Sequence, residues 1–238
     1  MKTSHWLSFF ALFVCCGVLF SSLFYSFSED STSFASTAEE RTSPVIIIDA
    51  GHGGEDGGAT GTNGVLEKEL NLTVSYMLSD LLRGAGYTVI QTRTEDRLLY
   101  AEGAQKGHKK QSDLENRVKF TEKYPNSILI SIHMNTFPLE NCEGVQVWYS
   151  QNDERSATLA KQIQDGVKEH LQPQNNRKIK AATNSIYLLR HAKTPAVLIE
   201  CGFLSTPSEC ARLCDTSYQQ KLALTLFDAI CENLSART

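Results

Sequence analysis

Four side chains of the sequence combine the residue types and the settings that metal-dependent hydrolysis needs. Each follows an apolar, β-branched run or opens an apolar repeat of helical spacing, and they are His52, Glu67, His133 and Glu200. Two imidazoles and a carboxylate are the ligand set of many catalytic zinc sites, which leave a fourth position for water. A further carboxylate beside the metal can act as general base and then as general acid. The pattern fits a hydrolytic zinc centre.

Each of these residues also has an ordinary structural interpretation, and spacing alone does not choose between the two. A histidine after a strand is often a structural hydrogen-bonding group, and a glutamate at a helix start favours the helix dipole. Glu200 is harder to explain in that way, because an unpaired carboxylate at the end of a buried strand is costly. Among the other histidines, only His191 is kept as a residue that could face the same cleft.

The first histidine lies in a glycine-rich stretch. Seven of the fifteen glycines of the chain fall between Gly51 and Gly64. Glycine tolerates positive φ and leaves room for another group to come close, so we expect loop geometry to orient His52. The same glycines would suit a mobile loop or a phosphate cradle. A Walker loop is excluded, because no Gly-Lys-Ser or Gly-Lys-Thr follows.

Short strands alternating with helices must position these residues. Apolar, β-branched runs predict strands at 45–49, 87–92, 127–132, 144–149 and 196–199. Several of these runs are nearly continuous, which is typical of strands covered on both faces. Apolar spacings of three and four predict helices at 70–81 (ending near Gly84), around 114–118, at 159–167 and at 218–234. The alternation predicts a single α/β domain.

The order of the elements predicts that the candidate residues lie together at one end of the sheet. If the strands before His52, His133 and Glu200 are parallel neighbours, their carboxyl ends form one crevice, and Glu67 can fold back to it. A further helix start is predicted at 206–209, where Thr206 would cap, Pro207 would fit the first turn and Glu209 would reach back to the cap N–H.

The N-terminus has the features of an export segment. Lys2 is followed by an uncharged, apolar run from Trp6 to Phe27. The run is longer than the core of a usual secretory signal and close to the length that spans a bilayer, so a cleaved signal and a retained membrane anchor both stay open. We expect this segment at 1–28, a flexible tether at 29–43 and the folded domain at 44–238, in the periplasm or outside the cell.

Charge and cysteine content narrow the class of protein further. The formal net charge is −4 and the only basic cluster is Lys106–Lys110, which we expect to be a solvated loop; no nucleic-acid partner is predicted. Five cysteines follow the N-terminal segment, and they are Cys142, Cys201, Cys210, Cys214 and Cys231. In an oxidising compartment two of these cysteines could form one disulfide. We favour the interpretation that most of them are small buried thiols.

Five ordered motifs resemble the zinc-dependent N-acetylmuramoyl-L-alanine amidases of the type 3 amidase family. They are Ile-Asp-Ala-Gly-His-Gly-Gly (48–54), Leu-Glu-Lys-Glu-Leu-Asn-Leu (66–72), Thr-Arg (92–93), Ser-Ile-His-Met-Asn (131–135) and Ile-Glu-Cys-Gly-Phe-Leu-Ser (199–205). The resemblance implies a twisted, mostly parallel sheet flanked by helices on both faces. It also implies hydrolysis of the amide between N-acetylmuramic acid and L-alanine in peptidoglycan.

The resemblance also distributes the roles. It implies one Zn²⁺ ion on His52, Glu67 and His133, with Glu200 as the catalytic carboxylate and Glu69 as the alternative to Glu67. Two features depart from the family: the stretch at 97–114 is longer than its compact pattern, and only a short connection follows Tyr149, where some similar proteins carry a helical plug over the site. We therefore expect a monomer that needs no activator.

Two other functions remain open at this point. A zinc peptidase that cuts within the stem peptide of peptidoglycan would use identical metal chemistry. A non-catalytic wall-binding protein on the same fold is the other alternative, although such a protein would be expected to have lost a ligand or the catalytic carboxylate.

Overall fold

The computed structural model describes residues 43–100, 108–139 and 141–236. Six strands form one sheet: β1 (Val45–Ala50), β2 (Val89–Gln91), β3 (Ser127–Asn135), β4 (Gln146–Tyr149), β5 (Lys180–Ala181) and β6 (Ala196–Phe203). Their order across the sheet is β2-β1-β3-β6-β4-β5, and every neighbouring pair is parallel except β4 with β6. The predicted strands all exist, and the mostly parallel sheet is confirmed.

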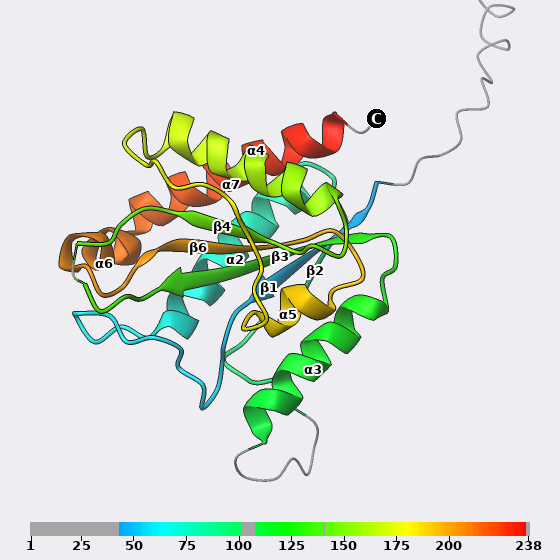
Figure 1. Cartoon of the computed structure of the whole chain (residues 1–238), viewed down its shortest axis with the longest axis horizontal. Coiled ribbons are helices and arrows are strands. Elements are labelled where there is room, and N and C mark those ends of the chain that lie inside the picture. The colour runs from blue at the N-terminus through cyan, green and yellow to red at the C-terminus, as the bar shows by residue number, and fades with distance from the viewer. Residues whose placement is uncertain (1–42, 101–107, 140, 237–238) are drawn as a thin grey trace, which may run out of the picture. The chain divides into compact units, whose positions relative to one another are not determined.

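Helices cover both faces of this sheet (Figure 1). They are α2 (Glu67–Gly84), α3 (Lys109–Glu122), α4 (Arg155–His170), α5 (Tyr187–His191), α6 (Pro207–Cys214) and α7 (Thr216–Ser235). Alternate residues of a strand point to opposite faces: Ile46 and Ile48 pack in the core under α2, α4 and α7, whereas Ile47 packs with the apolar residues of α3 and α5. The strands read as continuous apolar runs because both faces are buried.

Two short elements carry too little pattern to predict. β5 has two residues and α5 has five. Such short segments cannot display the alternation of a strand or the three-to-four-residue repeat of a helix. The connection after Tyr149 is short, as predicted, because α4 begins at Arg155.

The predicted capping box at α6 is wrong, although the helix starts where expected. The Thr206 side chain makes no cap hydrogen bond, and its Oγ1 donates to the Cys142 carbonyl at 2.5 Å. The buried Glu209 carboxylate instead accepts from the backbone N–H groups of Gly144 and Phe203, both at 2.8 Å. These two backbone N–H groups lie outside α6, and they occupy both oxygens of the carboxylate in place of the N–H at its own helix end.

The basic cluster is also not a simple solvated loop. Lys109 and Lys110 begin α3, and they form ion pairs with Glu55 at 2.8 Å and with Asp56 at 3.5 Å. The earlier part of the cluster, including Lys106, and the predicted export segment lie outside the described residues. All five cysteines after that segment are free thiols. No helix in the described part of the chain is both long and apolar enough to cross a membrane.

Candidate metal centre

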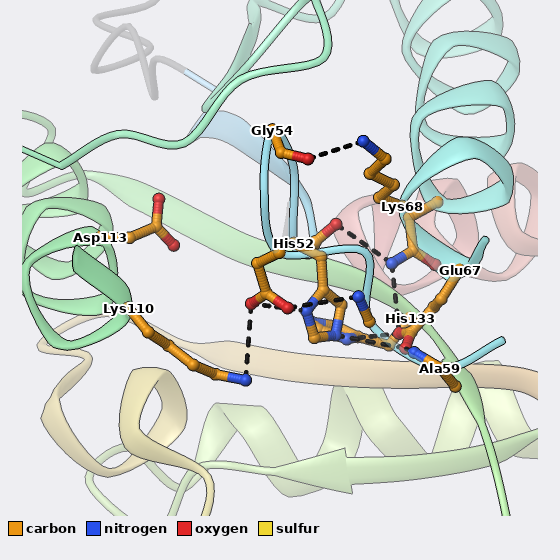
Figure 2. A network of polar contacts seen from close by, with 12 residues as sticks. His52, Gly54, Ala59, Glu67, Lys68, Lys110, Asp113 and His133 are labelled. Atoms are coloured by element: carbon orange, nitrogen blue, oxygen red, sulfur yellow. Dashed lines mark hydrogen bonds and ion pairs between the residues drawn. The ribbon is translucent and has the colours of Figure 1, made fainter. Parts of the chain in front are cut away.

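Three parallel neighbours in the middle of the sheet bring the candidate residues to one edge. β3 lies between β1 and β6, and His133 stands opposite Glu200 in the register of β3 and β6. His52 follows the end of β1, where Gly51 N–H donates to the Ile132 carbonyl at 3.0 Å. The ligand atoms of His52, Glu67 and His133 all lie within 4.8 Å of one another. Figure 2 shows these three side chains converging.

The Glu67 carboxylate is the hub of this group. Its two oxygens lie 3.2 Å from His52 Nε2 and 3.0 Å from His133 Nδ1. The backbone N–H groups of Ala59 and Met134 also donate to them, at 2.8 and 3.1 Å. Burial raises the pKa of Glu67, but the hydrogen bonds and charges of both histidines outweigh it and hold the pKa far below its usual range. Glu67 is therefore an anion that faces two ring nitrogens.

Two glycines allow the histidines to come this close. A Cβ atom at Gly51 would lie 2.2 Å from the ring of His133. At Gly58, whose φ is +68°, it would lie 2.5 Å from Glu67 Oε2 and 2.8 Å from the ring of His52. Any side chain at either position would push a candidate ligand away. Only glycine therefore fits at these two positions of the loop.

His52 itself has a φ of +60°, the left-handed region that non-glycine residues rarely adopt. Burial lowers its pKa, but hydrogen bonds to Asp56 and Glu67 and their charges raise it to about 9. A site that favours a proton so strongly is a site of negative potential. The same potential favours a metal cation between the imidazoles and the carboxylate.

Two buried arginines hold the backbone around His52. Arg117 Nη2 donates to the His52 carbonyl at 2.8 Å, and Arg93 Nη2 donates to the Gly51 carbonyl at 3.0 Å. Both guanidiniums also bind the Ala50 carbonyl, each at 2.9 Å. Arg117 further pairs with the buried Asp49 carboxylate at 2.5 Å. These contacts fix the unusual backbone at the end of β1.

Glu200 lies in different surroundings. Burial raises its pKa and the neighbouring Glu67 adds to this effect, so that the pKa is about 7 although His133 and His52 act to lower it. Within the described residues, its Oε2 atom is buried without a hydrogen-bond partner. Glu200 also lines a cavity of about 240 Å³ beside His52 and His133. The opposite walls of the cavity come from α3 and from the chain that leads into α5.

The structure thus brings four of the sequence candidates together and leaves two aside. Glu69 is exposed on α2. His191 is exposed on α5, where its ring lies 4.2 Å from that of Tyr187, and it does not line the described cavity. Asn71 also belongs to the site, because its Nδ2 donates to Glu67 Oε1 at 3.3 Å and to the Gly51 carbonyl at 3.1 Å. No role was predicted from the sequence for Asp49, Asp56, Asn71, Arg93 or Arg117. Three of these (Asp49, Asn71 and Arg93) stand inside the quoted motifs, which was the available signal.

Comparison with known proteins agrees with this geometry. A profile of the N-acetylmuramoyl-L-alanine amidase family matches residues 46–232, which contain all four candidate residues. The chain belongs to this family. A germination-specific N-acetylmuramoyl-L-alanine amidase of Bacillus subtilis (strain 168) is 37% identical over 231 residues, which are 96% of this chain and 94% of that protein.

Solved structures of family members have the same fold. The CwlD amidase from Clostridioides difficile, in complex with the GerS lipoprotein, is 38% identical, with a TM-score of 0.77 over 81% of this chain and 99% of that one. An N-acetylmuramoyl-L-alanine amidase from Clostridium difficile 630 is 27% identical, with a TM-score of 0.72 over 83% of this chain and 100% of that one. This family member therefore has the amidase fold over nearly its whole described length.

Proposed function

We propose that this amidase hydrolyses the amide bond between N-acetylmuramic acid and L-alanine in peptidoglycan. The observation that carries the proposal is the convergence of His52, Glu67 and His133 beside Glu200, in a chain of the N-acetylmuramoyl-L-alanine amidase family. The first three groups would hold the cofactor, and the fourth would move protons.

The donor set fits one zinc ion. Two ring nitrogens and an anionic carboxylate face one another, which is a common ligand set of catalytic zinc. Zinc bound there would lower the pKa of a water molecule and polarise the carbonyl of the amide. The hydrogen bonds from Ala59 and Met134 to Glu67 hold its carboxylate in place for such an ion.

Glu200 would carry the proton between the two halves of the reaction. Its buried Oε2, which has no hydrogen-bond partner among the described residues, is able to accept the proton of the attacking water. With a pKa of about 7, Glu200 can release this proton again near neutral pH. The proton would go to the leaving L-alanine nitrogen, so that cleavage of the C–N bond yields a carboxylate and an amine.

The cellular setting is a second part of the proposal. We infer that 1–28 exports the chain as a signal or as a membrane anchor, that 29–43 is a tether, and that 44–238 is the catalytic domain in the periplasm or outside the cell. One relative supports a place at the cell wall: a probable cell wall amidase, LytH of Staphylococcus aureus, is 31% identical over 190 residues.

Independence from an activator is a third part of the proposal. The Clostridioides difficile relative was solved in complex with the GerS lipoprotein. In this chain α4 begins soon after Tyr149, at Arg155, and the residues between them are too few for a helical insertion. We therefore propose that the isolated monomer is active. Purified, zinc-loaded protein that leaves peptidoglycan intact until a lipoprotein is added would refute this part alone.

Digestion of purified peptidoglycan, with and without a chelator, tests the main proposal. We expect mass spectrometry to find intact stem peptides that begin with a free L-alanine, and we expect the chelator to stop their release. Fragments cut within the stem peptide would instead identify a zinc peptidase. Binding to the wall without any released product would identify a non-catalytic protein.

A further inference from the structure

We propose that Asp56 is a positioning residue for the metal centre: it holds the Nδ1 proton of His52 and so presents Nε2 of the same ring as the ligand atom. This inference rests on the proposed metal site. It assigns a task to a carboxylate that stands beside the three ligands and is none of them.

The two nitrogens of His52 face different partners. Nδ1 lies 2.9 Å from Asp56 Oδ2, and Nε2 lies 3.2 Å from Glu67 Oε2. A neutral imidazole carries its proton on one nitrogen and its lone pair on the other. A proton donated from Nδ1 to Asp56 therefore leaves the lone pair on Nε2, the atom that faces Glu67 and the remaining ligand.

Asp56 is itself held by several contacts besides the one to His52. Its backbone N–H and carbonyl both pair with Gly53, each at 3.0 Å, which closes a tight turn after His52. Its Oδ1 accepts from the Gly58 N–H at 3.2 Å. Lys110 Nζ reaches from α3 to within 3.5 Å of Oδ2, and Figure 2 shows this lysine pointing toward the carboxylate beside His52. The carboxylate is thus held from three sides.

His52 needs this support more than His133 does. His133 lies within β3 and pairs with Glu200 in the ladder between β3 and β6, which keeps its register up to this pair and shifts just after it. His52 lies in a loop with a φ of +60°, so its ring is oriented by its hydrogen bonds. Partners of this kind typically change metal affinity by about 10- to 100-fold when they are removed.

Zinc affinity, measured by competition with a chelator, tests the inference. Asp56→Ala is expected to weaken zinc binding by about 10- to 100-fold, whereas Asp56→Asn, which keeps an oxygen acceptor, is expected to lose less. Glu55→Ala is the matched control, because Glu55 is the adjacent carboxylate and pairs with Lys109 instead of His52. The control is expected to bind zinc as the unchanged chain does. Equal melting temperatures would show that each variant is folded.

A second readout separates this inference from the proposed function. With ¹⁵N-labelled histidine, the unchanged protein is expected to show a His52 Nδ1–H signal protected from solvent exchange, and Asp56→Ala is expected to lose it. The signal can also be recorded in metal-free protein at alkaline pH. If the unchanged protein binds no zinc, the proposed function fails whatever this signal shows. Equal zinc affinity in Asp56→Ala, or a proton found on Nε2 of His52, would overturn the positioning role.

Discussion

The two carboxylates of the site stand in opposite surroundings. On the loop side, formed by the glycine loop at 51–66 and the start of α2, Glu67 accepts hydrogen bonds on both oxygens and is held as an anion. On the strand side, formed by the ends of β3 and β6, Glu200 has a buried oxygen without a partner in the described structure and a pKa of about 7. One carboxylate is suited to hold a cation and the other to exchange a proton.

The two sides also differ in what positions them. The loop side depends on buried charge, since Arg117 binds the Asp49 carboxylate and the carbonyls of Ala50 and His52. The strand side depends on strand pairing, which stays in register as far as His133 and Glu200, over an apolar core in which Ile199 is fully buried. An unusual backbone needs specific polar contacts, whereas a strand end takes its place from the ladder. The following experiments test this difference.

The largest effect is expected from Glu200→Gln. The amide cannot take a proton from water, so turnover should fall by about 10²- to 10⁴-fold, the usual contribution of a general base. Zinc content should stay unchanged, because Glu200 is not among the three facing ligand groups. Product release and bound zinc, measured on the same sample, check both statements.

Glu67→Gln provides the contrast to that variant. It removes the anion that both histidines face, so zinc should be lost along with activity. If Glu200→Gln also loses its zinc, or if Glu67→Gln keeps both zinc and activity, the division of roles between the two carboxylates is wrong.

Arg117→Met tests the buried charge of the loop side. The substitution leaves Asp49 and Asp113 without their guanidinium partner, at 1% and 3% exposure. Breaking a buried pair in this way costs about 3–5 kcal/mol. Urea denaturation should show this loss in the free energy of unfolding, and zinc affinity should fall as the His52 backbone loosens. A loss below about 1 kcal/mol, typical of an exposed pair, would contradict the scaffold role of Arg117.

Acid should weaken the same network. Burial raises the pKa of Asp49, but Arg117 and the hydrogen bonds from Ser131 and Thr92 outweigh it and lower the pKa from 3.8 to about 2. Because the pKa of Asp49 is lower in the folded state than in the unfolded state, its ionised form stabilises the fold at pH values above the unfolded-state pKa. About 2 kcal/mol of the free energy of unfolding should therefore be lost as the pH falls from about 4 towards 2. Unfolding free energies measured across this range, for the unchanged chain and for Asp49→Asn, should differ in slope. Parallel curves would contradict the shift.

The sequence predicted the strand side better than the loop side, for a physical reason. Continuous apolar runs before His133 and Glu200 mark strands buried on both faces, and parallel strands must end at one edge. Glu67 was predictable because it opens an apolar helical repeat. The network of Arg93, Arg117 and Asp56 was not, since its contacts join residues up to 68 positions apart, as in Arg117 with Asp49. No local period records such contacts. The capping box at Thr206 failed similarly, because the Gly144 N–H, 65 positions away, binds one oxygen of the Glu209 carboxylate.

The smallest effect is expected from Ile199→Val, directly beside Glu200 on the strand side. Ile199 pairs with Ile132 of β3 and Val147 of β4, and it is fully buried. Losing one methyl group there costs about 0.5–1.5 kcal/mol. The ladder on both sides stays intact, so Glu200 should keep its place and turnover should be nearly unchanged. Ile230→Val, the same deletion in α7 and equally buried, is the matched control for stability. A loss of turnover in Ile199→Val alone would mean that side-chain packing, and not strand pairing, positions Glu200.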